Sequence, residues 1–219
     1  MLDSSTINMI ITGIGETLLM VVFSTIFGYV FGLPLGVILY ISDKDGLKEN
    51  PKLYRALDVI VNIGRSIPFI ILLILIIPLT VLLVGKSYGT LATIVPLTVS
   101  AIPYIGRMVE ASLKEVDKGV IEAGKAMGAT TFQIITKIVL LEARPSLISG
   151  ATICVGTIIS YSAMAGVVGG GGLGDIAIRY GYYRYQTDVM IITVIIIVLI
   201  VQMFQLIGNK LANKLDKRK

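Results

Sequence analysis

The sequence contains no histidine and only one cysteine, Cys154, among its 219 residues. A His/Cys zinc site needs several such ligands, a Ser-His-Asp triad needs its histidine, and an intramolecular disulfide needs two cysteines. All three are therefore excluded. We predict that the chain is not an enzyme and that it has no catalytic, cofactor-binding or metal-binding residues.

Charge is also scarce. Charged residues make up 15% of the chain, where soluble domains have roughly a quarter, while 55% of the residues are hydrophobic and the mean hydropathy is +0.87. The apolar residues form long blocks and lack the amphipathic period that a water-facing surface requires. We predict an all-α polytopic membrane protein with a single transmembrane domain over residues 1–219.

Five apolar stretches are long enough to cross a bilayer, since a hydrocarbon core of about 30 Å takes roughly 20 residues of helix. They cover residues 14–41, 59–84, 90–105, 147–168 and 189–208. The third is short by this measure, which leaves open a helical continuation through Leu113. No charged n-region precedes the first stretch, which is too long for a signal-peptide core, so we expect it to stay in the mature protein.

The positive charges are divided unequally between the two sides of these spans. The side with many holds Lys44, Lys48, Lys52, Arg55, Arg107, Lys114, Lys118, Lys125, Lys137, Lys210, Lys214, Lys217, Arg218 and Lys219, and the other holds only Lys86, Arg179 and Arg184. The positive-inside rule then predicts an N-terminus outside, a C-terminus in the cytoplasm and a cytoplasmic loop over residues 106–146. The net charge of +5 is explained by this rule, and we expect no nucleic-acid partner.

Several polar or helix-breaking residues lie in or beside the predicted spans. The prolines remove helix hydrogen bonds that lipid cannot replace, so we expect packed, kinked helices around a pathway, although proline is also common in membrane helices. Arg65 is predicted at the cytoplasmic start of the second span, where its side chain can snorkel to the interface. Glu16, at the outer end of the first span, is expected to reach the headgroups. The affected prolines are Pro34, Pro68, Pro78, Pro96 and Pro103.

The cytoplasmic loop contains a predicted short helix over residues 120–127. In this helix Ile121, Gly124 and Gly128 would share one face, and Glu122 could pair with Lys125 at i,i+3. Thr130, followed three residues later by Gln133, has the pattern of a capping box, which predicts a turn and then a second helix. Such a helix could dock onto a partner or lie on the lipid headgroups, and the residue pattern leaves both open.

Two polar or aromatic groups lie near the predicted outer surface. In the outer half of the fourth span, a flexible thioether and hydroxyl groups could line or close a passage, or could serve helix packing; these residues are Ser160, Tyr161, Ser162 and Met164. A tyrosine cluster is most simply an interfacial aromatic belt, with a protein contact as the alternative; its members are Tyr180, Tyr182, Tyr183 and Tyr185. The GGGGLG run after the fourth span is predicted to be a flexible or tightly packed outer loop.

The loop resembles the EAA loop of binding-protein-dependent ABC importer permeases. That pattern, E-A-A-x3-G-x9-I-x-L-P, is matched by Glu122-Ala123, Gly128, Ile138 and Leu140. Gly124 stands in place of the second alanine and Leu141 in place of the proline. The resemblance implies a coupling helix that contacts an ATPase and includes Glu122, Ala123, Gly124, Met127 and Gly128.

From about Gly28 to the C-terminus, and most densely over 120–190, the chain is similar to methionine-importer permeases. Such permeases are understood to form homodimers in the bacterial inner membrane, with two ATPase subunits below and a substrate-binding protein outside. The resemblance implies alternating-access import of L- and D-methionine. Transport of another amino acid or a quaternary amine remains open, as does a non-transporting membrane scaffold. A secondary transporter is disfavoured because no span has a deeply placed acidic residue.

Overall fold

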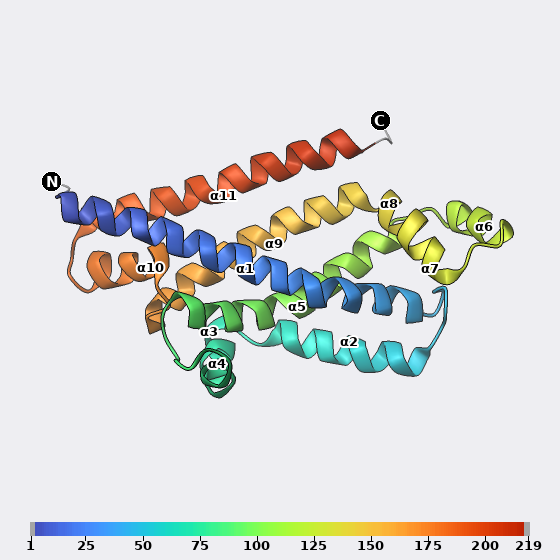
Figure 1. Cartoon of the computed structure of the whole chain (residues 1–219), viewed down its shortest axis with the longest axis horizontal. Coiled ribbons are helices and arrows are strands. Elements are labelled where there is room, and N and C mark those ends of the chain that lie inside the picture. The colour runs from blue at the N-terminus through green and yellow to red at the C-terminus, as the bar shows by residue number, and fades with distance from the viewer. Residues whose placement is uncertain (1–2, 217–219) are drawn as a thin grey trace.

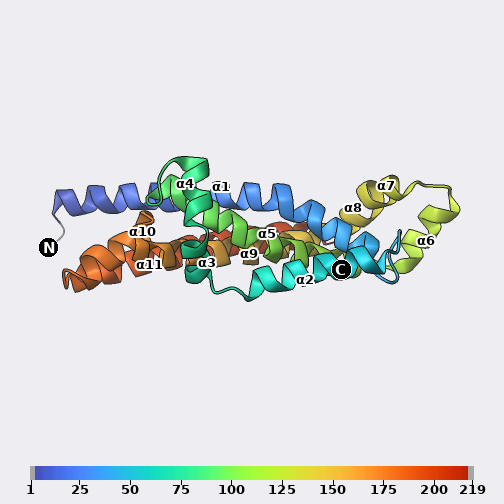
Figure 2. The same ribbon diagram turned by 90° about the horizontal axis from the view of Figure 1, so that it is seen from below.

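The computed structural model describes residues 3–216, and every regular element in that range is helical (Figure 1). The long helices lie along a common axis, and in both views α6 and α7 project from one end of the bundle while the N-terminus lies at the other (Figures 1 and 2). The elements are α1 (Ser4–Ser42), α2 (Pro51–Ser66), α3 (Phe69–Leu75), α4 (Ile77–Val84), α5 (Thr90–Lys114), α6 (Lys118–Ala126), α7 (Thr131–Ile134), the π-helix η1 (Ile135–Val139), α8 (Leu140–Glu142), α9 (Arg144–Ala165), the 3₁₀-helix η2 (Gly166–Val168), α10 (Gly172–Ile176), the π-helix η3 (Ala177–Tyr182) and α11 (Thr187–Leu215).

Within residues 3–216, four helical stretches are long and apolar enough to cross a membrane: α1, α5, α9 with η2, and α11. They correspond to four of the five predicted spans. Helix α1 begins ten residues before the predicted start at residue 14, and α5 continues beyond residue 105, through Leu113 to Lys114. A fifth crossing exists only if the bent pair α2 and α3 is counted as one span.

The region of the predicted second span, 59–84, contains the end of α2 and all of α3 and α4, with breaks beside Pro68 and Pro78, where kinks are expected. Helices α2 and α3 meet at an angle of 102°, and α4 follows after a second break at Ile76. Proline disfavours helical geometry in the residue before it, and Ile67 before Pro68 is extended, with φ −76° and ψ 122°. Pro34 lies within α1, and Pro96 and Pro103 lie within α5; both helices are continuous through these prolines.

A stripe of glycines lets α1 approach α5 closely. Gly28, Gly32 and Gly36 follow one another at four-residue intervals and are buried. A Cβ atom added to Gly36 would lie 2.5 Å from the carbonyl oxygen of Gly106 on α5. Small residues at this spacing are a common feature of membrane helix interfaces, because they allow backbones to pack directly.

The glycine run at the start of α10 is tightly packed. The N–H of Gly172 donates to Glu16 Oε2 at 2.6 Å, and the N–H of Leu173 donates to Thr17 Oγ1 at 2.9 Å. Glu16 therefore binds the start of α10, and the expectation that it reaches the headgroups is replaced by this contact. Of the two structures expected for the GGGGLG run, the packed one is found.

Candidate functional site

The helix predicted over residues 120–127 is present as α6. Asp117 caps its first turn by accepting a hydrogen bond from the N–H of Gly119 at 2.6 Å. The chain leaves the helix at Gly128, whose φ of +78° suits glycine because it has no Cβ. The predicted capping box is confirmed: Thr130 and Gln133 exchange hydrogen bonds with each other's backbone N–H at the start of α7.

The buried face of α6 is turned toward its own chain. Ile121 and Gly124 are buried, and a Cβ on Gly124 would lie 2.6 Å from Ile138 Cδ1 of η1. Gly128 lies beyond the helix and is exposed, so the prediction that it shares this face is wrong. Gly124 thus allows close packing inside the loop and is not part of its outer surface.

The outward face of the loop has apolar side chains that nothing in the described chain covers. Met127 is 79% exposed and Phe132 is 76% exposed, and Val120, in the first turn of α6, is also exposed. Glu122 and Ala123 are exposed as well, but within residues 3–216 Glu122 forms no ion pair with Lys125, contrary to prediction. Four of the five predicted coupling residues are therefore on the outside, namely Glu122, Ala123, Met127 and Gly128.

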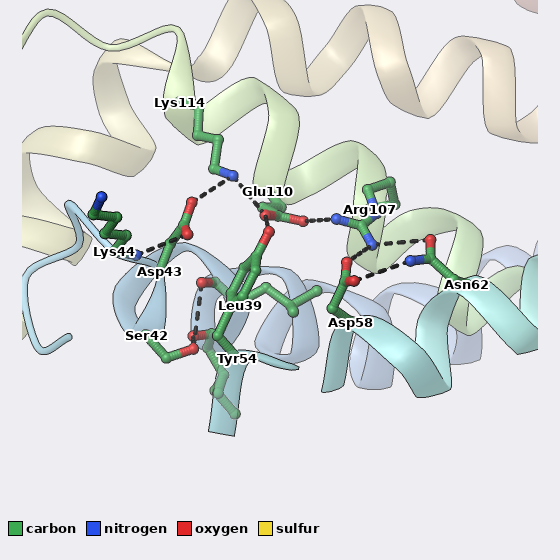
Figure 3. A network of polar contacts seen from close by, with 11 residues as sticks. Leu39, Ser42, Asp43, Lys44, Tyr54, Asp58, Asn62, Arg107, Glu110 and Lys114 are labelled. Atoms are coloured by element: carbon green, nitrogen blue, oxygen red, sulfur yellow. Dashed lines mark hydrogen bonds and ion pairs between the residues drawn. The ribbon is translucent and has the colours of Figure 1, made fainter. Parts of the chain in front are cut away.

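A polar network ties the base of this loop to three helices (Figure 3). Its centre is Glu110 on α5, which is 1% exposed. Glu110 accepts hydrogen bonds from Arg107 at 2.7 Å, from Lys114 at 2.8 Å and from the hydroxyl of Tyr54 on α2 at 3.1 Å. Because these partners satisfy both carboxylate oxygens, the charge can remain buried.

The network extends to α2 and to the end of α1. Arg107 forms an ion pair with Asp58 and donates to Asn62 Oδ1 at 3.1 Å, while Lys114 forms an ion pair with Asp43 at 2.7 Å. Burial raises the pKa of the Asp43 carboxyl, but hydrogen bonds from Lys114 and the Lys44 N–H, with the charge of Lys114, lower it overall. Since α6 begins only four residues after Lys114, its base is fixed to the bundle.

The four candidate pathway residues on α9 do not form one cluster. Ser162 is buried, and its hydroxyl donates to the Ile159 carbonyl at 2.7 Å. Tyr161 stacks on Phe69 of α3, with ring centroids 4.6 Å apart. Ser160 and Met164 are exposed, one helical turn apart, on a face that also has the exposed Ile153 and Val167.

The predicted tyrosine belt lies around the turn between η3 and α11. Tyr182, Tyr183 and Tyr185 are exposed, whereas the Tyr180 ring is covered by the Arg184 guanidinium at 4.6 Å. Exposed rings at this end suit either a membrane interface or a protein contact, so the two expectations for the cluster stay predictions.

Sequence comparison matches residues 32–219 to the family described as binding-protein-dependent transport system inner membrane component. The chain belongs to this family. It is 50% identical over 211 residues to a Vibrio cholerae protein named "Probable D-methionine transport system permease protein MetI", covering 96% of this chain and 94% of that protein. It is 52% identical over 158 residues to D-methionine transport system permease protein MetI of Escherichia coli (strain K12), covering 72% and 73%.

Solved structures agree with this assignment to the inner membrane component family. A chain of the MetNI methionine ABC transporter in an inward-facing conformation is similar with a TM-score of 0.97 and 46% identity, covering 99% of this chain and 100% of that chain. An amino acid ABC transporter crystallised with histidines is similar with a TM-score of 0.71 and 19% identity, which shows a shared fold alone.

Sequence reasoning about this inner membrane component missed two features. The charge spacing of Arg107, Glu110 and Lys114 at i,i+3 and i,i+4 was a visible signal for part of the network. The glycine spacing on α1 was a signal for its close packing. The pairings of Arg107 with Asp58 and of Lys114 with Asp43 join separate helices, and no local pattern indicates them.

Proposed function

We propose that this chain is the permease subunit of an ATP-driven importer of methionine, including D-methionine. The observation that supports it most strongly is the near full-length similarity to a chain of the MetNI methionine ABC transporter. The names of the Vibrio cholerae and Escherichia coli relatives point to the same solute. Two copies of the chain would form the pathway, with two ATPase subunits and an extracytoplasmic substrate-binding protein as partners.

The outer surface of the loop from α6 to α7 is the proposed contact with the ATPase. Its exposed Met127 and Phe132 are large apolar side chains of the kind enriched at protein interfaces, and α6 alone is too short to be stable in water. The network around Glu110 would transmit movement of the loop to α1, α2 and α5. The loop would face the cytoplasm, with the N-terminus of the chain outside; the tail residues Lys217, Arg218 and Lys219 that contribute to this assignment lie outside the described residues.

The exposed face of α9 is the proposed wall of the passage between two copies. Ser160 and Met164 lie on it toward the outer end of the helix, and Met164 would narrow the passage there. Tyr161 and Ser162 point elsewhere and are excluded from this wall.

Reconstitution tests the function directly. Proteoliposomes that contain the chain, its ATPase and its binding protein should accumulate radiolabelled methionine only when ATP is inside with the ATPase. Unlabelled L- and D-methionine should compete, and other amino acids or quaternary amines should not. Preferential uptake of one of those competitors would replace methionine as the substrate, and no uptake of any solute would favour the scaffold alternative.

A further inference from the structure

A cavity of about 200 Å³ lies where the broken second span meets α5 and α9. It is lined by residues of four helices, among them Arg65 at the end of α2, Phe69 on α3, Tyr104 on α5 and Tyr161 on α9. The volume is below the roughly 300–1,000 Å³ of pockets that hold drug-sized ligands, so only a small solute fits.

Arg65 lies far from the cytoplasmic end of the bundle. Arg65 lies fourteen residues along α2 from its first residue, Pro51, a distance of about 21 Å at 1.5 Å per residue. A Cβ on the neighbouring Gly64 would lie 3.0 Å from Pro103, which is in the middle of α5. Arg65 therefore lies well along the bundle, on a helix that begins eight residues before the predicted span.

The polar groups of the cavity wall are incompletely satisfied. Within residues 3–216, the Arg65 guanidinium has no ion pair or hydrogen bond, and the hydroxyls of Tyr104 and Tyr161 have no hydrogen-bond partner. An arginine at membrane depth is costly unless it meets an anion, a polar cavity or water, and such residues mark solute pathways. Arg65 is exposed and lines the cavity, so its unpaired guanidinium is accessible to a small solute there.

Two other wall residues offer acceptors. The Ser100 hydroxyl donates to the Leu97 carbonyl at 2.8 Å, and the Thr157 hydroxyl donates to the Ile153 carbonyl at 3.1 Å. With their protons committed, the lone pairs of both oxygens can accept hydrogen bonds from a cation. The stacked rings of Phe69 and Tyr161, nearly parallel at 6°, supply an apolar part of the cavity wall.

We propose that this cavity is an intramembrane binding site for a zwitterionic α-amino acid with an apolar side chain. Arg65 binds the carboxylate, Ser100 and Thr157 accept from the ammonium, and the edges of the Phe69 and Tyr161 rings contact the side chain. For methionine, the thioether has a favourable contact with aromatic ring edges. This inference rests on the proposed function, since it places the solute of that importer within each permease subunit.

Equilibrium binding of radiolabelled L-methionine tests the site in the purified permease–ATPase complex in lipid nanodiscs, without the binding protein. The ATPase subunit alone, assayed in parallel, defines any binding that does not belong to the permease. Arg65→Gln should weaken methionine binding by about tenfold or more, because a charge-assisted, bidentate contact is lost. Arg55→Gln is the matched control, as Arg55 is exposed on the same helix and does not line the cavity.

L-methioninamide, which lacks the carboxylate, distinguishes carboxylate recognition from a general effect. It should compete at least about tenfold more weakly than methionine against the wild-type complex, and this preference should vanish in Arg65→Gln. Arg65→Lys retains the positive charge but lacks the planar guanidinium, so its preference for methionine over the amide should be intermediate. This variant also tests the site if Arg65→Gln does not assemble.

Unchanged methionine binding and unchanged preference over the amide in both Arg65 variants would overturn the site. A fall in binding that Arg55→Gln reproduces would overturn it also. The proposed function has a separate test: it fails if the wild-type importer, with its binding protein, does not import methionine. Intact wild-type import with unaltered binding by the Arg65 variants removes the cavity site alone.

Discussion

The carboxylate of Glu110 is almost completely removed from solvent and is held by three partners from two helices. A buried charge is tolerated only with such compensation, and loss of the charge leaves Arg107 and Lys114 facing each other across a neutral group. At the residue scale this position links the end of α5, just before α6, to α2 through Tyr54 and to the end of α1 through Lys114.

Glu110→Gln should destabilise the permease by about 1–3 kcal/mol, since hydrogen bonds to a charged acceptor are replaced by weaker ones. The melting temperature of the purified permease–ATPase complex should fall, and ATP hydrolysis should become less dependent on substrate. Glu115→Gln is the control, because Glu115 is exposed and directly follows α5. Identical melting of Glu110→Gln and wild type would show that the network contributes nothing to stability.

Met127 and Phe132 are expected to contact the ATPase. Replacing both with alanine should leave the melting temperature of the isolated permease unchanged, because both side chains are exposed, and should reduce co-purifying ATPase by about tenfold or more. Gly124→Leu should instead lower the melting temperature of the isolated permease, because the new Cβ would overlap Ile138. Any loss of co-purifying ATPase in this variant would follow from that instability. If the amount of co-purifying ATPase is normal when Met127 and Phe132 are both alanine, the loop does not dock there. The alternative, a segment lying on the lipid headgroups, would then be favoured.

Met164→Ala should widen the proposed outer constriction. Basal solute leak from proteoliposomes, or ATPase activity without the binding protein, should rise several-fold while assembly stays intact, because the exposed side chain makes little contact with its own chain. Ile153→Ala, on the same face of α9 but toward the other end, is the control. If leak, transport and ATPase activity all match wild type, Met164 serves packing.

At the scale of elements, the contact between α1 and α5 depends on glycine. Gly36→Ala should lower the yield of folded protein and destabilise it by about 1–3 kcal/mol or more, because the new Cβ would overlap the Gly106 carbonyl. Gly15→Ala on the same helix is the matched control, since nothing lies within 4 Å of its added Cβ. Thermal denaturation in detergent measures both; equal stability of the two variants would contradict the close packing.

The elements were predictable to different degrees. Helix α6 and the capping box before α7 follow from local residue chemistry, and the sequence indicates both correctly. In the second span the proline itself indicates a break near Pro68, but the size of the bend, 102° between α2 and α3, cannot be derived from the residues around it. The fourth and fifth spans agree with α9 and α11 to within a few residues at their start.

At the scale of the whole molecule, the N-terminus lies at the end of the bundle opposite to α6 (Figure 1). Single cysteines at Ser4 or Lys86 should therefore react with an impermeant thiol reagent in intact cells, and one at Lys118 should not, since all three positions are exposed. The native Cys154 is buried and gives little background. Labelling at Lys118 from outside would reverse the proposed orientation.

The sequence by itself determined the class of protein, the four long spans and the local form of the loop from α6 to α7. These depend on composition and on residues within one or two helical turns of each other. Only the tertiary structure decided which way Gly124 faces, which candidate pathway residues share a surface, and that Arg65 reaches a cavity in the middle of the bundle. Each of these depends on contacts between helices far apart in the chain, and the bilayer makes almost every face of such helices apolar, so hydropathy cannot reveal which face meets which partner.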